Sequence, residues 1–317
     1  MLSRIKQANP LTFHKKGTHA KALLALALVS FLWGTTWVAS KAGVKHMPAL
    51  QLAGIRQLIG GLLYVVFFAA KGRTFPKGKQ WWPVIILSIL NFLLSNGLST
   101  WGVKYISSGL GAIIGAVFPL WLVIIAMIAG TSKLTTKAII GFIMGFVGIC
   151  IIFYDHLQDF FNADFRFGIF LSVTATLSWA FATLYTKQQA ASFNPYFSIG
   201  LQMLISGIAL TGITRLTGDH IPLSQIPLES WLSIAYLAIA GSVLAFMAYL
   251  YALQHLPTEQ VSIYAYINPI VAILIGAWLF DEKLNAFITI GGLVAIVGVY
   301  MVNESFRRQH PSKRLPS

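Results

Sequence analysis

Ten apolar stretches of about 20 residues each follow one another along this chain, separated by short polar segments. A helix of about 20 apolar residues is long enough to cross the hydrocarbon core of a bilayer. Charged residues make up only 10% of the sequence, against about 25% in a soluble domain, so a soluble fold could not cover this much apolar surface. We therefore expect an all-α integral membrane protein with ten transmembrane helices, at 22–41, 48–70, 83–102, 107–129, 136–154, 167–187, 195–214, 230–254, 257–280 and 285–303.

The basic residues indicate how these helices are oriented. The formal net charge of +14 is spread over loops and helix ends, so nucleic acid is not expected as a partner. With the N-terminus inside the cell, sixteen Lys and Arg residues fall on the cytoplasmic side and six on the other, which is the positive-inside bias. We expect a multi-pass protein of the plasma (cytoplasmic or inner) membrane, with the N-terminal segment 1–21 and the basic tail 304–317 both in the cytoplasm.

The second half of the chain repeats the first. The stretch Ser30–Lys41 returns 146 positions later as Thr176–Lys187, and further along the offset becomes 150. The corresponding pairs include Trp33 and Trp179, Lys41 and Lys187, and Pro119 and Pro269. Chance similarity between apolar helices explains matches of Leu and Ile, but hardly Trp, Lys, Pro and Gly in one order. The sequence thus predicts two repeats of five helices each, at 22–154 and 167–303.

An odd number of helices in each repeat has a topological consequence. The second repeat must enter the membrane from the opposite side, so the two are expected to form inverted-topology repeats. Secondary transporters are built in this way, with the substrate near the bilayer midplane at the repeat interface. The sequence therefore favours a transporter.

Several motifs resemble those of a known family. They are Phe31-Leu32-Trp33-Gly34-Thr35-Thr36-Trp37 with Lys41, then Pro48 and Gly54-Ile55-Arg56, and, near the end, Asp281-Glu282-Lys283-Leu284 with Gly291 and Gly298. Together they are similar to EamA-type members of the drug/metabolite transporter superfamily, over about residues 20 to 305. One departure is Thr131-Ser132-Lys133-Leu134, which has no acid before its Lys. The resemblance implies an exporter (efflux) of a small metabolite, with the fifth and tenth helices peripheral and the other eight around a central cavity.

Polar and aromatic residues inside the spans are the candidates for this cavity. An amide in hydrocarbon must find partners, and Asn91 and Ser95 share one face of the third span. The candidate lining residues are Trp33, Asn91, Ser95, Trp101, Trp179 and Tyr264. The alternatives are hydrogen bonding between helices for the polar residues, and packing or lipid contact for the aromatic ones.

Three further residues have specific expected roles. Arg56, eight residues into its span, is a candidate contact for a substrate anion, with outward snorkelling as the alternative. Pro119 and Pro269 each remove a backbone hydrogen bond and are candidate gating kinks. Because no Asp or Glu lies near the middle of a span, uniport, exchange and ion coupling all stay open.

The distribution of acidic residues limits the other classes of function. We expect no metal, cofactor or catalytic residue, since the nine acids are scattered and form no cluster. The expected partners are a small-molecule substrate, amino acid-like or drug-like, and the lipid bilayer; a homodimer is possible but not required. The alternatives are an integral membrane enzyme acting on a lipid or isoprenoid, and a non-transporting membrane scaffold.

Overall fold

A computed structural model describes residues 16–128, 135–154, 158–189, 194–256, 261, 264–280 and 286–309. Within these residues every regular element is a helix, and ten of the helical runs are apolar: six are long enough to cross a membrane and four are shorter. The predicted all-α membrane architecture is thereby confirmed. Segment 281–284, which carries part of the family resemblance, and segment 131–134, where the sequence departs from the family pattern, lie outside the described residues.

The first half contains five helical spans, two of them composite. The first two are α1 (Lys16–Gly43) and α2 (Ala49–Ala70). The third consists of η1 (Gly78–Gln80), α3 (Trp81–Leu87), η2 (Ser88–Gly97) and α4 (Leu98–Tyr105). The fourth consists of α5 (Ser108–Gly115) and α6 (Phe118–Ile128), and the fifth is α7 (Thr136–Tyr154). The segment η2 is a π-helix, with wider turns than an α-helix.

The second half has the same plan. After η3 (Asp159–Phe161) come α8 (Ala163–Gln189), α9 (Pro195–Leu216) and η4 (Leu223–Gln225). The eighth span consists of α10 (Leu228–Tyr236), the π-helix η5 (Leu237–Leu244) and α11 (Ala245–His255). The last two helices are α13 (Tyr264–Phe280) and α14 (Ala286–Gln309). The helix α8 begins four residues before the predicted span because Asn162 caps its first turn, accepting from the Asp164 N–H at 2.8 Å.

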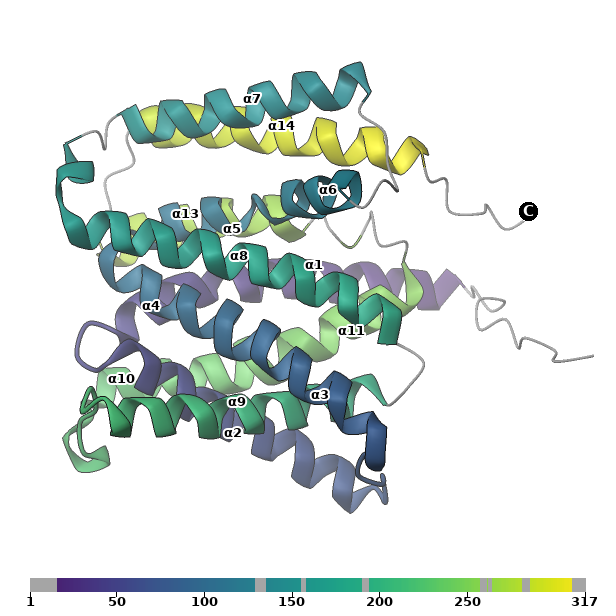
Figure 1. Cartoon of the computed structure of the whole chain (residues 1–317), viewed down its shortest axis with the longest axis vertical. Helices are drawn as coiled ribbons and strands as arrows, with labels where there is room; N and C mark the ends of the chain where they lie inside the picture. Colours follow the sequence, from purple (N-terminus) through teal and green to yellow (C-terminus); the bar gives the residue numbers. More distant parts are fainter. Residues whose placement is uncertain are drawn as a thin grey trace, which may run out of the picture.

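Helices from the two halves pair with their counterparts. The second helix of each half, α2 and α9, pack against each other, as do the fifth, α7 and α14. Figure 1 shows α1 and α8, the first helix of each half, running in opposite directions through the bundle, and α7 with α14 at one edge. A Cβ added to Gly291 of α14 would lie 2.7 Å from Gly148 O of α7, so this pair approaches closely only because both positions lack side chains.

The polar side chains of α2 bind to the second half of the chain. Gln51 exchanges two hydrogen bonds with the backbone of Ile221, at 2.7 and 3.0 Å. Tyr64 Oη donates to Val243 O at 2.8 Å, and Gln57 Oε1 accepts from Ser206 at 2.5 Å. The two repeats are therefore joined by polar contacts inside the bundle as well as by apolar packing.

The two equivalent prolines lie in different local structures. Pro119 is the second residue of α6, and the fourth span is interrupted before it, between Gly115 and Phe118. Its ring cannot donate to Gly115 O and would clash with that carbonyl, so the chain ends one helix and starts another. Pro269 lies inside the continuous helix α13. The predicted single helix over 107–129 is thus wrong at residues 116 and 117.

Candidate functional site

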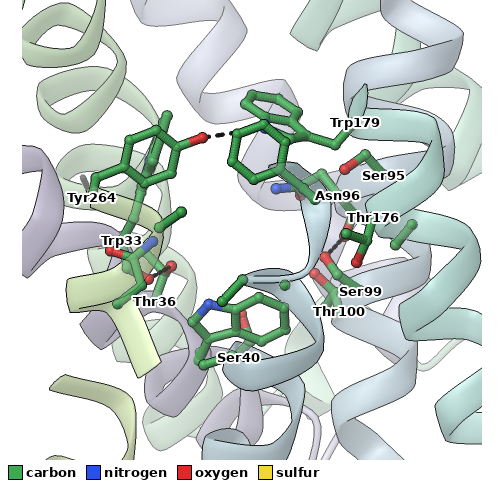
Figure 2. A pocket seen from close by; sticks show the side chains of 18 of the residues that line it. Trp33, Thr36, Ser40, Ser95, Asn96, Ser99, Thr100, Thr176, Trp179 and Tyr264 are labelled. Carbon is green, nitrogen blue, oxygen red and sulfur yellow. Dashed lines mark hydrogen bonds between the residues drawn. The ribbon is translucent and has the colours of Figure 1, made fainter. Parts of the chain in front are cut away.

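A cavity of about 150 Å³ lies in the middle of the bundle. An engineered protein cavity of about this volume holds benzene, so the space suits a small organic molecule. Figure 2 shows Trp33 and Thr36 on one side of it and Ser95, Ser99 and Thr100 on the other. The lining residues are Trp33, Thr36, Trp37, Ser40, Arg56, Asn91, Ser95, Asn96, Ser99, Thr100, Ala112, Gly115, Ala116, Phe118, Ala175, Thr176, Trp179, Phe246, Tyr264, Ala265 and Asn268.

Aromatic rings gather at one end of the cavity. Trp33 is at their centre, and its ring centroid lies 5.0 to 6.1 Å from those of four neighbours. We call this group the aromatic cluster: Trp33, Trp179, Phe246, Tyr249 and Tyr264. Two indoles are fixed by hydrogen bonds, Trp33 Nε1 to Gly241 O at 3.2 Å and Trp179 Nε1 to Tyr264 Oη at 3.3 Å. The rings come from α1, α8, α11 and α13, so both halves of the chain build this end.

The opposite wall is polar and belongs to the third span. Its amides are oriented by side chains of α2 and α9 that lie behind them. Asn91 Nδ2 donates to Gln202 Oε1 at 3.0 Å, and Asn96 Oδ1 accepts from Gln57 Nε2 at 3.2 Å. Since α9 contributes no residue to the lining, it acts here as a support for the wall.

Two π-helical segments flank the cavity, at equivalent places in the third and eighth spans. Where the backbone hydrogen bonds change between the α-helical and the π-helical pattern, some carbonyl oxygens become available to side chains. In η2, Phe92 O accepts from Gln57 and Leu90 O from Ser178, at 3.0 and 2.9 Å. In η5, Gly241 O accepts from Trp33, as Val243 O does from Tyr64. Neighbouring helices are thus anchored to both segments.

Arg56 of α2 also lines the cavity, although only 4% of its surface is exposed. Its Nη2 donates to Ser242 Oγ of η5 at 3.3 Å. Its Nε is buried and has no hydrogen-bond partner. The side chain therefore remains inside the bundle and does not snorkel outward.

Six of the predicted site residues meet at this cavity: Trp33, Arg56, Asn91, Ser95, Trp179 and Tyr264. Trp101 does not line it, because it follows Ser99 by two residues and so points about 200° away around the helix. Its ring makes an edge contact with Phe167, with centroids 5.2 Å apart. Neither Pro119 nor Pro269 is a lining residue.

Other lining residues were not selected from the sequence. Thr36 and Ser40 lie three and seven residues after Trp33, so helical spacing could have suggested them. Thr176 and Asn268 could have been found from the polar stripes of their spans. Phe246 carries no such signal, because it is one apolar residue among many in the eighth span.

Comparison with known proteins agrees with this architecture. A family model described as the EamA-like transporter family matches residues 20–154 and again 166–304. The uncharacterized inner membrane transporter YedA of Escherichia coli K12 is 28% identical over 266 residues, covering 82% of this chain and 83% of the relative. The uncharacterized transporter YvbV of Bacillus subtilis 168 is 25% identical over 294 residues, covering 91% and 93%.

A solved crystal structure has the same fold. It superposes with a TM-score of 0.65 and covers 92% of this chain and 99% of its own, at 16% sequence identity. At that identity the likeness concerns the fold alone.

Proposed function

The chain belongs to the EamA-like transporter family and is a multi-pass membrane transporter, and on this premise we propose that it carries a small organic molecule across the cytoplasmic membrane by alternating access. The cargo is amino acid-like or drug-like in size, and the direction is outward. The central cavity is the substrate site.

One observation carries this proposal. Trp33 and Trp179, which occupy the same position in the two repeats, meet at the end of the cavity with ring centroids 6.1 Å apart. In transporters with inverted repeats the substrate lies near the midplane, where the repeats face each other. A cavity lined by the first helix of both repeats is in the position that this mechanism needs.

Two apolar clusters along α1 are suitable as gates. Leu26 and Leu32 belong to a cluster that includes Ala248, Leu256 and Tyr264. Val44, after the end of α1, belongs to another with Leu52, Val103 and Ile234. The cavity-lining residues of α1 lie between these two clusters in the sequence. Opening one cluster while the other stays packed would expose the cavity to one side of the membrane at a time.

The proposed topology follows from the opposite directions of α1 and α8 (Figure 1) and from the distribution of Lys and Arg. Repeat 22–154 and repeat 167–303 have inverted topology, and both termini lie in the cytoplasm. The interruption before Pro119 and the position of Pro269 within α13 make these two residues candidate points of bending during gating.

The test combines an export screen with reconstituted transport. Cells overproducing the protein are screened for resistance to, and release of, amino acids and small aromatic compounds, and hits are measured as uptake into proteoliposomes. Trp179→Ala should lower the uptake rate by about tenfold or more, because it opens the aromatic end of the cavity. The matched control Trp82→Ala, at a side chain that is 65% exposed, should leave uptake unchanged. Normal membrane insertion without transport of any compound class would refute the proposal.

A further inference from the structure

Arg56 is a buried cation with unused hydrogen-bonding capacity. A guanidinium has five N–H donors, yet the side chain makes one hydrogen bond, to Ser242 at 3.3 Å, and its Nε has no partner. It is 96% buried and lines the cavity. Charges removed from water are usually paired or fully hydrogen-bonded, so this arrangement is incomplete as it stands.

The helices around α2 offer no counter-ion. The elements packed most extensively on α2 are α4, α9, α10, η2 and η5, while α1 and α3, which also touch it, contain no Asp or Glu. Of the five main neighbours, α4, α9, η2 and η5 contain no Asp or Glu either. The acid of α10, Glu229, is exposed and lies 3.6 Å from His46. Within the described part of the chain, the positive charge of Arg56 is therefore not matched by a carboxylate of the protein.

The aromatic cluster lies close to this charge. A Cβ added to Gly241 would lie 3.9 Å from Arg56 Nη2, and the carbonyl of the same residue accepts from Trp33. The cation and the central indole are thus on either side of one glycine. One small molecule can reach both.

We infer that the transported molecule is a small organic anion, with its carboxylate bound by Arg56 and its apolar part against the aromatic cluster. This rests on the proposed transport function. The planar guanidinium matches a carboxylate in a bidentate geometry. Aromatic rings alone would also attract a cation, but Arg56 in the same cavity repels one. The sign of the ligand's charge therefore distinguishes binding through Arg56 from binding to the aromatic rings alone.

Binding of matched compounds to the purified full-length protein tests the inference. Phenylacetate, phenylacetamide and phenethylamine share a phenyl ring and differ in charge, and quenching of tryptophan fluorescence reports binding because Trp33 and Trp179 line the cavity. Phenylacetate should bind about tenfold or more tightly than phenylacetamide, as charged hydrogen bonds imply. Phenethylamine should bind most weakly. Chloride, which has the charge without the ring, should compete with phenylacetate only at about hundredfold higher concentration.

Variants separate Arg56 from a general effect of charge. Arg56→Gln should remove the preference for phenylacetate over phenylacetamide, and Arg56→Lys should retain part of it. The control Lys45→Gln removes a positive charge that lies 4.1 Å from the ring of Phe280, outside the cavity lining, and should leave the preference intact. If Arg56→Gln does not fold, the order in which the wild-type protein and Arg56→Lys bind the three compounds still tests the inference.

The outcomes also separate this inference from the proposed function. Equal binding of the carboxylate and the amide, tighter binding of the amine, or an unchanged preference in Arg56→Gln would overturn the inference. If proteoliposomes then carry a neutral or cationic compound, transport stands and the anion assignment alone fails. If phenylacetate binds through Arg56 but no compound is transported, the anion site stands and the transport function fails.

Discussion

Gln57 provides a quantitative test of how α2 is attached to the rest of the bundle. Its side chain is 1% exposed and takes part in three hydrogen bonds. Nε2 donates to Phe92 O at 3.0 Å and to Asn96 Oδ1 at 3.2 Å, and Oε1 accepts from Ser206 at 2.5 Å. Gln57→Leu removes all three while keeping nearly the same volume.

The expected loss of stability follows from these contacts. Hydrogen bonds between membrane helices contribute about 0.6 kcal/mol each on average and about 1.7 at most. Three such bonds give a loss of about 2 kcal/mol in the free energy of unfolding, with a ceiling near 5. Ser206→Ala removes one of them and should cost about 0.6 kcal/mol. Both substitutions remove the hydrogen bond between Gln57 and Ser206. Adding Ser206→Ala to Gln57→Leu should therefore lower the free energy of unfolding by less than about 0.5 kcal/mol more.

Reversible unfolding in mixed micelles, with dodecyl maltoside titrated by dodecyl sulfate and followed by circular dichroism, measures these differences. A loss below about 0.5 kcal/mol for Gln57→Leu would refute the reasoning. So would strict additivity of the two substitutions, because it would mean that Gln57 and Ser206 do not interact. Gln57→Leu should also weaken substrate binding, since it releases the amide of Asn96 at the polar wall.

Three other predictions concern packing and transport. Gly291→Ala should destabilise the protein by about 1–3 kcal/mol in the same unfolding assay, because its Cβ would collide with the backbone of α7 near Gly148. The control is Gly212→Ala, whose added Cβ has no neighbouring atom within 4 Å and which should be neutral or stabilising. Equal effects of the two substitutions would contradict the close packing of α7 and α14. Trp33→Phe, which keeps a ring but loses the bond to η5, should slow proteoliposome uptake by a few fold, whereas Trp33→Ala should abolish it; wild-type uptake by the Ala variant would exclude the cavity as the substrate site. Cys150→Ser changes the single, exposed cysteine and should shift stability by less than about 0.5 kcal/mol, and a larger loss would indicate an unrecognised contact.

Much of the fold could be predicted because its signals are strong. Apolar runs of membrane-spanning length mark the helices directly. The glycines that let α7 and α14 approach follow the repeat offset of 150, which matches Gly141 with Gly291 and Gly148 with Gly298. The extended start of α8 was harder to predict, because its first turn carries Asp164 and is too polar for an apolar window.

The site was only partly predictable. Trp33 and Trp179 stand out as matched aromatic residues inside apolar helices, and both line the cavity. The π-helical segments η2 and η5 have no signature in composition or periodicity, so the phase of the third span beyond Ser95 could not be read from regular spacing. Phe246 is indistinguishable in the sequence from its apolar neighbours, and only the packing of α11 brings it to the cavity.

The attachments of α2 have a consequence for how the protein is made. A helix inserted early in synthesis carries Gln51, Arg56, Gln57 and Tyr64, and each of these side chains has a partner in the second half of the chain. Arg56 and Ser242 are 186 residues apart, which corresponds to roughly 10–40 s of translation at about 5–20 residues per second. During that interval the nascent first half holds a cation and two amides in the membrane without their partners from the second half. Biogenesis should therefore depend on factors that shelter unfinished helices, and the first half expressed alone should be degraded unless the second half is supplied with it.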